Sequence, residues 1–217
     1  MPMLIRICAA LAVATALAGC AGLGPEEPDK VIVDHGGPAG VSVERTGVLF
    51  GSLAFAPRNL AMSALSLHLR PVDGRGHRFE MFATNQLQHA RWRTPDVDTD
   101  GQRIWVFAGR VPVGRYEIAL AAVSGADLND VHWMNFKPAI PVTVTQEGAV
   151  YIGRWQYSPA DAPLSGKQMR VPGSGLVLAD TPDEDQLLLA RRRGGASPIG
   201  HLGIDDVLRN MIDQGRI

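Results

Sequence analysis

The middle of the chain alternates between apolar and polar positions, which is the pattern of strands buried on one face. In residues 63–70, three leucines alternate with serine, histidine and arginine, and residues 77–83 repeat the pattern with Glu80 on the polar face. The same reasoning predicts strands at residues 48–55, 103–109, 115–124, 131–136, 140–145, 149–156 and within 169–179. Short strands at regular spacing predict a mainly β fold, a single antiparallel β-sandwich.

Three short turns are predicted to join neighbouring strands as hairpins. Asp73-Gly74 is a hairpin turn signal between the strands at 63–70 and 77–83. Residues 110–114 hold a proline and a glycine suited to a tight reversal, which would pair strands 103–109 and 115–124. Residues 146–148 would close another hairpin, between the strands at 140–145 and 149–156.

The last 40 residues change to a helical pattern. Thr181, Pro182 and Glu184 suit the N-cap, first and third positions of a helix, and the arginines at 191–193 suit its C-terminus. A second helix is predicted at 204–213, with an apolar stripe made of Ile204, Val207, Leu208, Met211 and Ile212. The stripe fits packing on the sandwich, which we favour, or docking into a partner's groove.

The N-terminus has the pattern of a secretory signal: one arginine at position 6, an apolar run, then small residues before Cys20. The apolar run is too short to span a bilayer, and no other segment is long enough to do so. The sequence Leu17-Ala18-Gly19-Cys20 resembles the lipobox of bacterial lipoproteins. The resemblance implies cleavage before Cys20 and lipidation of that residue. In Gram-negative lipoproteins, an aspartate directly after the lipidated cysteine retains the protein in the inner membrane. This chain has Ala21 at that position, so the resemblance implies sorting to the outer membrane.

Composition sets limits on the mature chain. Removal of residues 1–19 leaves 198 of the 217 residues and a formal net charge of −2, which excludes charge-driven nucleic-acid binding as a default. Cysteine occurs only at positions 8 and 20, so a chain processed at Cys20 has no disulfide. We expect a signal at 1–19, a lipidated flexible tether at 20–40, a sandwich at 41–177 and a helical extension at 178–217.

A second resemblance concerns the fold. Val111, Pro112, Gly114, Tyr116 and Ile118 follow a hydrophobic-Pro-x-Gly-x-Tyr-x-hydrophobic pattern. This pattern resembles one in transthyretin-like and carboxypeptidase-regulatory-like β-sandwich modules, and it implies an immunoglobulin- or transthyretin-like sandwich. Residues 136–155 are also similar to the closing hairpin of small envelope lipoproteins. A shared fold does not imply a shared function.

The sharpest candidate for a metal site is Asp96-Val97-Asp98-Thr99-Asp100-Gly101. Three carboxylates at alternate positions before a glycine match the first half of a Ca²⁺ loop. The twelfth position of that loop requires an acid, and here it is Phe107. We therefore interpret the segment as an acidic hairpin tip, with a weak Ca²⁺ site as the alternative. The histidines at 35, 68, 77, 89, 132 and 201 show no metal-ligand spacing, and we predict no cofactor.

Other residues fit binding more readily than catalysis. The tryptophans at 92, 105, 133 and 155 fit a platform for a glycan or peptide, although core packing is the commoner role. Trp105 alternates with Ile104 and Val106, so one face of that strand should be less buried. The arginines at 191–193 fit contacts with anionic groups or a solvated helix end. No Gly-x-Ser-x-Gly elbow and, after processing at Cys20, no free thiol occur.

These patterns together predict a lipid-anchored protein of the cell envelope with a non-catalytic binding or scaffolding role. Its expected partners are the membrane, through the lipid on Cys20, and an envelope protein or glycan. Three alternatives remain open: an assembly factor that docks a partner through its C-terminal helix, a weak Ca²⁺- or glycan-binding module, and an unrecognised envelope hydrolase.

Overall fold

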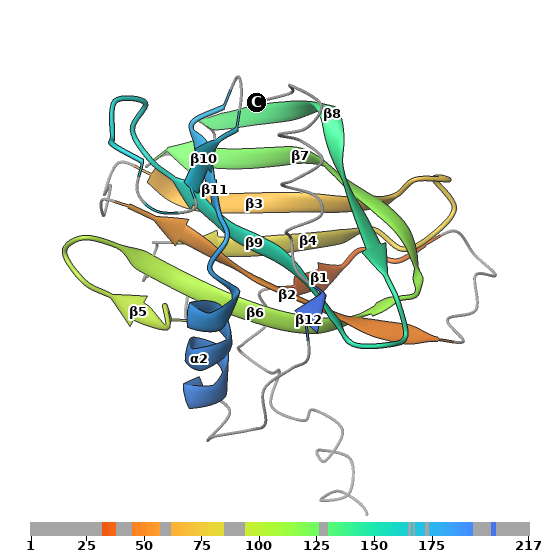
Figure 1. The fold of residues 1–217 in the computed structure, drawn as a ribbon. Helices are drawn as coiled ribbons and strands as arrows, with labels where there is room; N and C mark the ends of the chain where they lie inside the picture. Colours follow the sequence, from red (N-terminus) through yellow and green to blue (C-terminus); the bar gives the residue numbers. More distant parts are fainter. Residues whose placement is uncertain are drawn as a thin grey trace, which may run out of the picture.

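The computed structural model describes residues 32–37, 45–56, 62–84, 94–125, 130–164, 166, 168–171, 174–192 and 201–202. These residues form two β-sheets and one helix, labelled α2 (Figure 1). The prediction of a mainly β fold with a short C-terminal helix is therefore confirmed. Cys20, the signal and the second predicted helix at 204–213 lie outside the described residues, and no described helix is long and apolar enough to cross a membrane.

The first sheet has the strand order β1-β4-β3-β7-β8, and every neighbouring pair is antiparallel. The predicted Asp73-Gly74 hairpin joins β3 to β4, and Gly74 adopts the left-handed φ of 69° that such turns favour. The strands are β1 (Ile32–Asp34), β3 (Met62–Pro71), β4 (Phe79–Thr84), β7 (Gly114–Gly125) and β8 (Val131–Val144).

The second sheet has the order β10-β11-β9-β2-β6-β5, and β12 also pairs with β9. It is a mixed sheet, because β2 and β9 run parallel, as do β12 and β9. The expectation of a purely antiparallel fold is wrong at these two pairs. The strands are β2 (Thr46–Phe55), β5 (Val97–Asp98), β6 (Arg103–Pro112), β9 (Ala149–Tyr157), β10 (Gln168–Arg170), β11 (Leu176–Ala179) and β12 (His201–Leu202).

Two of the predicted hairpins are sheet-to-sheet crossings instead. β6 lies in the second sheet and β7 in the first, although only Val113 separates them. β8 and β9, joined by residues 145–148, likewise lie in different sheets. Pro112 and Gly114 at the first turn and Gly148 at the second indicate that the chain turns there. They do not determine which strands pair, because pairing depends on the distant strand that each segment meets. β6 and β9 both pair with β2.

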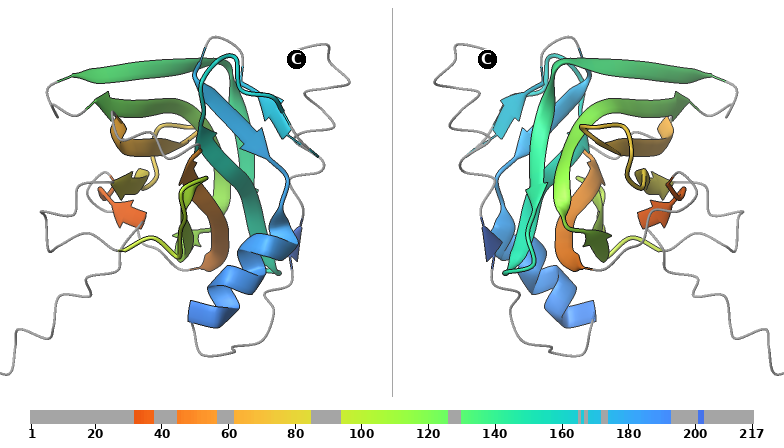
Figure 2. Two further views of the ribbon diagram at one scale, coloured as in Figure 1. Left: turned by 90° about the vertical axis from the view of Figure 1, so that its left-hand side faces the viewer. Right: turned by 90° about the vertical axis from the view of Figure 1, so that its right-hand side faces the viewer.

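The two sheets lie face to face (Figure 2). Side chains from both sheets form one hydrophobic core. Its largest fully buried members include Trp105, Trp155 and Tyr151 from the second sheet and Leu65 and Leu67 from the first. Phe79 and Met81 of β4, which alternate with the outward Glu80, belong to this core as predicted. The described residues include no cysteine. Because burial of apolar surface contributes about 25 cal/mol per Å², this shared core is the main source of their stability.

The N-terminal boundary of the folded unit lies earlier than expected. Ile32–Asp34, which we assigned to the flexible tether, forms β1 and pairs with Phe79–Met81 of β4. A side chain on Gly109 of β6 would collide with the end of the Ile32 side chain. Ile32 thus occupies the space that this glycine leaves open. Through Ile32, β1 contacts the second sheet as well as its own.

Helix α2 (Pro182–Arg192) begins at the predicted position and packs on the outer face of the second sheet (Figure 2). Its Leu189 is buried against Ala54, Ile104 and Val106. Both faces of β6 are therefore buried, since Trp105 faces the core and its neighbours face the helix. The prediction of a less buried face beside Trp105 was wrong because the helix covers it. β11 also runs to Ala179, past the expected end of the sandwich at residue 177.

The Pro-x-Gly-x-Tyr segment has a definite local structure. The hydroxyl of Tyr116 donates to the carbonyl oxygen of Pro112, four residues earlier, over 3.0 Å. The ring of Tyr116 lies 3.4 Å from the position where a Cβ on Gly114 would stand, so glycine lets the ring fold back over the turn. Burial, with the carboxylates of Asp34 and Asp73, raises the pKa of Tyr116 to about 12. The motif thus fixes the crossing between the sheets.

Candidate functional site

The outer face of the first sheet, which faces away from the core, carries the most distinctive exposed side chains of the described residues. The register places them in two adjacent rows across the strands. One row consists of Phe82, Ser66, Ala122 and Trp133, and the next consists of Val33, Glu80, His68, Leu120 and Asn135. We call these residues, together with His35, the Trp133 face.

Trp133 is the centre of this face. It lies on β8, the edge strand, and 57% of it is exposed to solvent, the highest value among the large exposed hydrophobic residues of the described chain. Its ring centroid lies 5.6 Å from that of His68 on β3. Because β7 runs between β8 and β3, the indole must lean across β7, over the small side chain of Ala122 directly opposite. The indole therefore contacts His68 while more than half of the residue remains open to solvent.

Polar groups surround the indole and are held by one another. Glu80 Oε2 lies 3.0 Å from His35 Nε2, and its other oxygen lies 4.0 Å from His68 Nε2. His68 Nε2 is in turn 3.2 Å from the hydroxyl of Ser66. The longer separation leaves Glu80 Oε1 able to accept a hydrogen bond from a ligand.

The electrostatics of His68 follow from its position. Partial burial lowers its pKa below the ordinary value, the charge of Glu80 acts in the opposite direction, and His35 adds to the lowering. His68 is therefore neutral at pH 7, and Glu80 is the one carboxylate in the two rows. The face combines an aromatic surface with hydrogen-bonding groups and little net charge.

The structure places the predicted tryptophans differently from one another. Trp105 and Trp155 are 1% and 0% exposed and belong to the core, as the commoner interpretation expected. Trp133 is open, and Trp92 lies outside the described residues. Among the described residues the tryptophans thus do not form one platform, and a single indole is available to a ligand.

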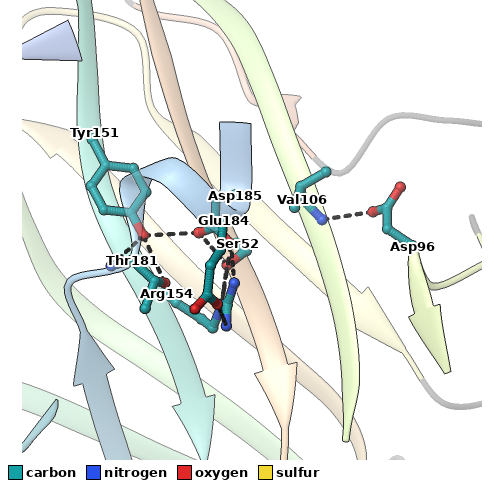
Figure 3. Close-up of polar contacts among 8 residues, drawn as sticks. All are labelled: Ser52, Asp96, Val106, Tyr151, Arg154, Thr181, Glu184 and Asp185. Carbon is teal, nitrogen blue, oxygen red and sulfur yellow. Dashed lines mark hydrogen bonds and ion pairs between the residues drawn. The ribbon is translucent and has the colours of Figure 1, made fainter. Parts of the chain in front are cut away.

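The acidic loop at 96–101 forms the hairpin between β5 and β6. Asp96 Oδ2 accepts from the backbone N–H of Val106 over 2.7 Å, and Asp98 Oδ1 accepts from Nε of buried Arg103 over 2.9 Å (Figure 3 shows the Asp96 contact). The carboxylates of Asp96 and Asp98 thus hold the hairpin together. In the described part of the chain, no three His, Cys, Asp or Glu side chains converge as metal ligands, Asp100 included.

The histidines are partly gathered by the fold. His35 and His68 flank Glu80, and His77 Nδ1 lies 2.9 Å from Asp34 Oδ2 beside them. His132 is exposed, 3.5 Å from Asp130. His89 lies outside the described residues, and of His201 only the backbone pairing of β12 with β9 is described.

A second polar cluster is buried beneath helix α2 (Figure 3). Asp185, 1% exposed, accepts hydrogen bonds from Ser52 over 2.7 Å, from Tyr151 over 2.8 Å and from two nitrogens of Arg154. Glu184 accepts a further bond from Arg154 over 3.0 Å. We call this cluster the Asp185 joint, because it fastens the first turn of α2 to β2 and β9.

The charges of the Asp185 joint depend on each other. Burial by itself lowers the pKa of Arg154, but the adjacent Asp185 carboxylate outweighs it, so the pKa lies above its ordinary value. Burial raises the pKa of the Asp185 carboxyl, and Arg154 with the hydroxyl donors limits that rise. The pKa of Tyr151 is raised by burial and by Asp185, which keeps its hydroxyl protonated as a donor. The joint is enclosed, so it acts as a structural connection.

Sequence reasoning missed the Asp185 joint and the composition of the Trp133 face. An arginine inside the apolar segment 149–156 was the available signal for the joint, since a buried charge needs a partner. For the face, alternation correctly turned His68 and Glu80 outward, but only strand order shows that both lie near Trp133. Arg191 and Arg192 are exposed at the end of α2, and Arg193 lies outside the described residues.

Comparison with known proteins adds little. No family model matches the sequence, and no curated protein matches it. A leucine-rich repeat protein from Bacteroides thetaiotaomicron VPI-5482 is a solved structure with some similarity. It is 10% identical, with a TM-score of 0.32, over 52% of this chain and 14% of that chain. At this level the likeness supports neither a fold nor a function, so both are inferred from the residues of this chain.

Proposed function

We propose that this protein is a lipid-anchored, non-catalytic binding protein of the cell envelope, and that the Trp133 face is its recognition surface. The observation that carries the proposal is the 57% exposure of Trp133 on the outer face of the first sheet. An exposed indole leaves apolar area in water, which costs free energy unless a ligand covers it. Tryptophan is also among the residues most enriched at the energetic centres of interfaces.

The anchoring part of the proposal comes from Cys20 and the lipobox-like sequence around it. The position of β1 sets the length of the segment between the anchor and the fold. Eleven residues, 21–31, separate Cys20 from the first described strand, and fully extended they reach at most about 40 Å. Such a tether would hold the folded unit close to the membrane while leaving it room to turn.

Anchoring is tested with Cys20→Ser. We expect the wild-type protein to sediment with membranes and to incorporate labelled fatty acid. The serine variant should incorporate none and should appear in the soluble fraction or as an uncleaved precursor. Fatty-acid labelling of the variant equal to wild type would contradict the proposal.

Recognition is tested by placing a photoreactive phenylalanine analogue at position 131 in living cells, because Val131 precedes Trp133 by two residues on the same face of β8 and its replacement keeps the indole. The matched control is position 187 on α2, because Leu187 is 53% exposed and lies over the other sheet. We expect crosslinked material from position 131 and none from position 187. Equal yields, or no product from either position, would show that the Trp133 face is not a recognition surface.

A further inference from the structure

We propose that the ligand of the Trp133 face is an uncharged, N-acetylated sugar chain. The inference rests on the proposed function, since it takes the same face as the recognition surface and names the class of its ligand. The elements that recognise sugars in general are an open aromatic ring for the C–H face of a sugar and fixed polar groups around it for hydroxyls. The Trp133 face presents both.

The aromatic element is the open side of the indole. Trp133 stands opposite Ala122 across the β7–β8 pair, its ring centroid lies 5.6 Å from that of His68, and 57% of the residue is exposed to solvent. A ring held in this way loses little conformational freedom when a flat ligand stacks on it. A sugar ring offers such a flat, weakly apolar surface.

The polar element lies on the strands beyond. Glu80 Oε1 has no hydrogen bond from His68 at 4.0 Å, so it can accept from a hydroxyl or amide N–H. His35 is exposed and held against the other oxygen of Glu80, and Asn135 is exposed beside Trp133 on β8. Asn135 on β8 and Glu80 on β4 stand in the same row, three strand spacings of about 4.8 Å apart, or roughly 14 Å. A ligand that contacts both ends must be an oligomer.

Charge and apolar contacts narrow the class further. The nearby ion pair Arg70–Glu117, with 2.6 Å between Nε and Oε1, is closed on itself, and Glu80 is the charged group of the two rows. Arg78, two residues before Glu80 on the same outward side, is exposed and carries the opposite charge. The face therefore has no net charge to attract an anionic or a cationic chain, and an uncharged chain fits it better. Leu120 is half-buried in the same row as Glu80 and provides apolar surface for the methyl group of an acetamide.

The test uses the purified mature chain in detergent and the β-1,4-linked hexamer of N-acetylglucosamine, with binding measured by isothermal titration calorimetry. We expect saturable binding that weakens at least about tenfold in Trp133→Ala and in Glu80→Gln, and that is unchanged in Leu187→Ala. Hyaluronate, an anionic polymer with the same N-acetylated sugar, should bind more weakly. Thermal unfolding at the wild-type temperature shows that each variant is folded.

Absence of hexamer binding to the wild-type chain, or undiminished binding to Trp133→Ala, would overturn the sugar inference. The photocrosslinking at position 131 separates this outcome from failure of the proposed function. If the crosslinked product is a protein, such as one that adds a strand to the edge at β8, recognition stands and the sugar inference is wrong. If there is neither product nor hexamer binding, both proposals are wrong.

Discussion

At the scale of single residues, Asp185 is the side chain whose loss should matter most. It is the shared acceptor of Ser52, Tyr151 and Arg154 beneath helix α2. Because all three donors are buried, they have no access to water as a substitute. The Arg154 charge in particular would be left without its main partner.

We predict that Asp185→Ala lowers the free energy of unfolding by about 3–5 kcal/mol, the typical cost of breaking a buried ion pair. Urea denaturation measures it. Adding Arg154→Met to this variant should recover part of the loss, because it removes the unpaired charge. If Asp185→Ala alone lowers the free energy of unfolding by less than about 1 kcal/mol, water reaches the Asp185 joint.

Gly47 is a residue whose lack of a side chain is required by close approach. A Cβ at this position would overlap the backbone carbonyl oxygen of Thr145, where the end of β8 passes β2. Backbone cannot move aside as a flexible side chain can. We predict that Gly47→Ala destabilises the protein by about 1–3 kcal/mol. Gly101→Ala is the control, because its Cβ would meet only Thr99 Oγ1 at 4.0 Å.

His68 gives the stability a defined pH dependence. Its pKa in the folded state is lowered, mainly by burial, below the ordinary value of 6.5. Between these two pKa values the unfolded chain binds more protons than the folded one, so this contribution is present above pH 6.5 and is lost as pH falls through the folded pKa. Comparing urea denaturation at pH 7.5 and 5.5, we predict a smaller loss of stability for His68→Gln than for wild type. An equal loss of stability in the two proteins would mean that a group other than His68 causes the pH dependence.

At the scale of elements, helix α2 shows how two leucines of one segment differ. Leu189 is 3% exposed against β2 and β6, and Leu187 is 53% exposed on the outer side. We predict that Leu189→Ala costs about 2–4 kcal/mol of unfolding free energy, through lost burial and a cavity, and that Leu187→Ala costs less than about 0.5 kcal/mol. Chemical denaturation of the two variants compares them directly, and similar values would indicate that α2 does not stay docked.

The elements also show the reach of sequence patterns. Period-two alternation located most of the strands because each one buries one face. The capping residues located the start of α2 because they bond to backbone groups within the first turn of the helix. The same patterns assigned two crossings, at Val113 and at 145–148, as hairpins. A turn's sequence controls local φ and ψ, whereas pairing depends on the burial that distant strands offer.

At the scale of the whole molecule, β9 is the strand on which the second sheet depends. It pairs with β2, β11 and β12, and it supplies Tyr151 and Arg154 to the Asp185 joint. We predict that a chain ending after residue 148 does not fold, whereas one ending after residue 192 retains the β-sheet signal and cooperative thermal unfolding. Circular dichroism distinguishes the two. Cooperative unfolding of the shorter chain would show that strands β1 to β8 are stable without β9.

The sequence by itself determined the mainly β character, the positions of most strands, the Asp73-Gly74 hairpin and the helix at 182–192, although it divided β8 into two strands. Each of these follows from interactions between residues close in the chain, or from the need of a periodic stripe to be buried. The tertiary structure alone decided the mixed second sheet, the early strand at 32–34, the burial of both faces of β6 and the proximity of Trp133 to His68 and Glu80. These features arise from contacts between segments tens of residues apart, and alternation shows only which way a side chain points, not what lies opposite it.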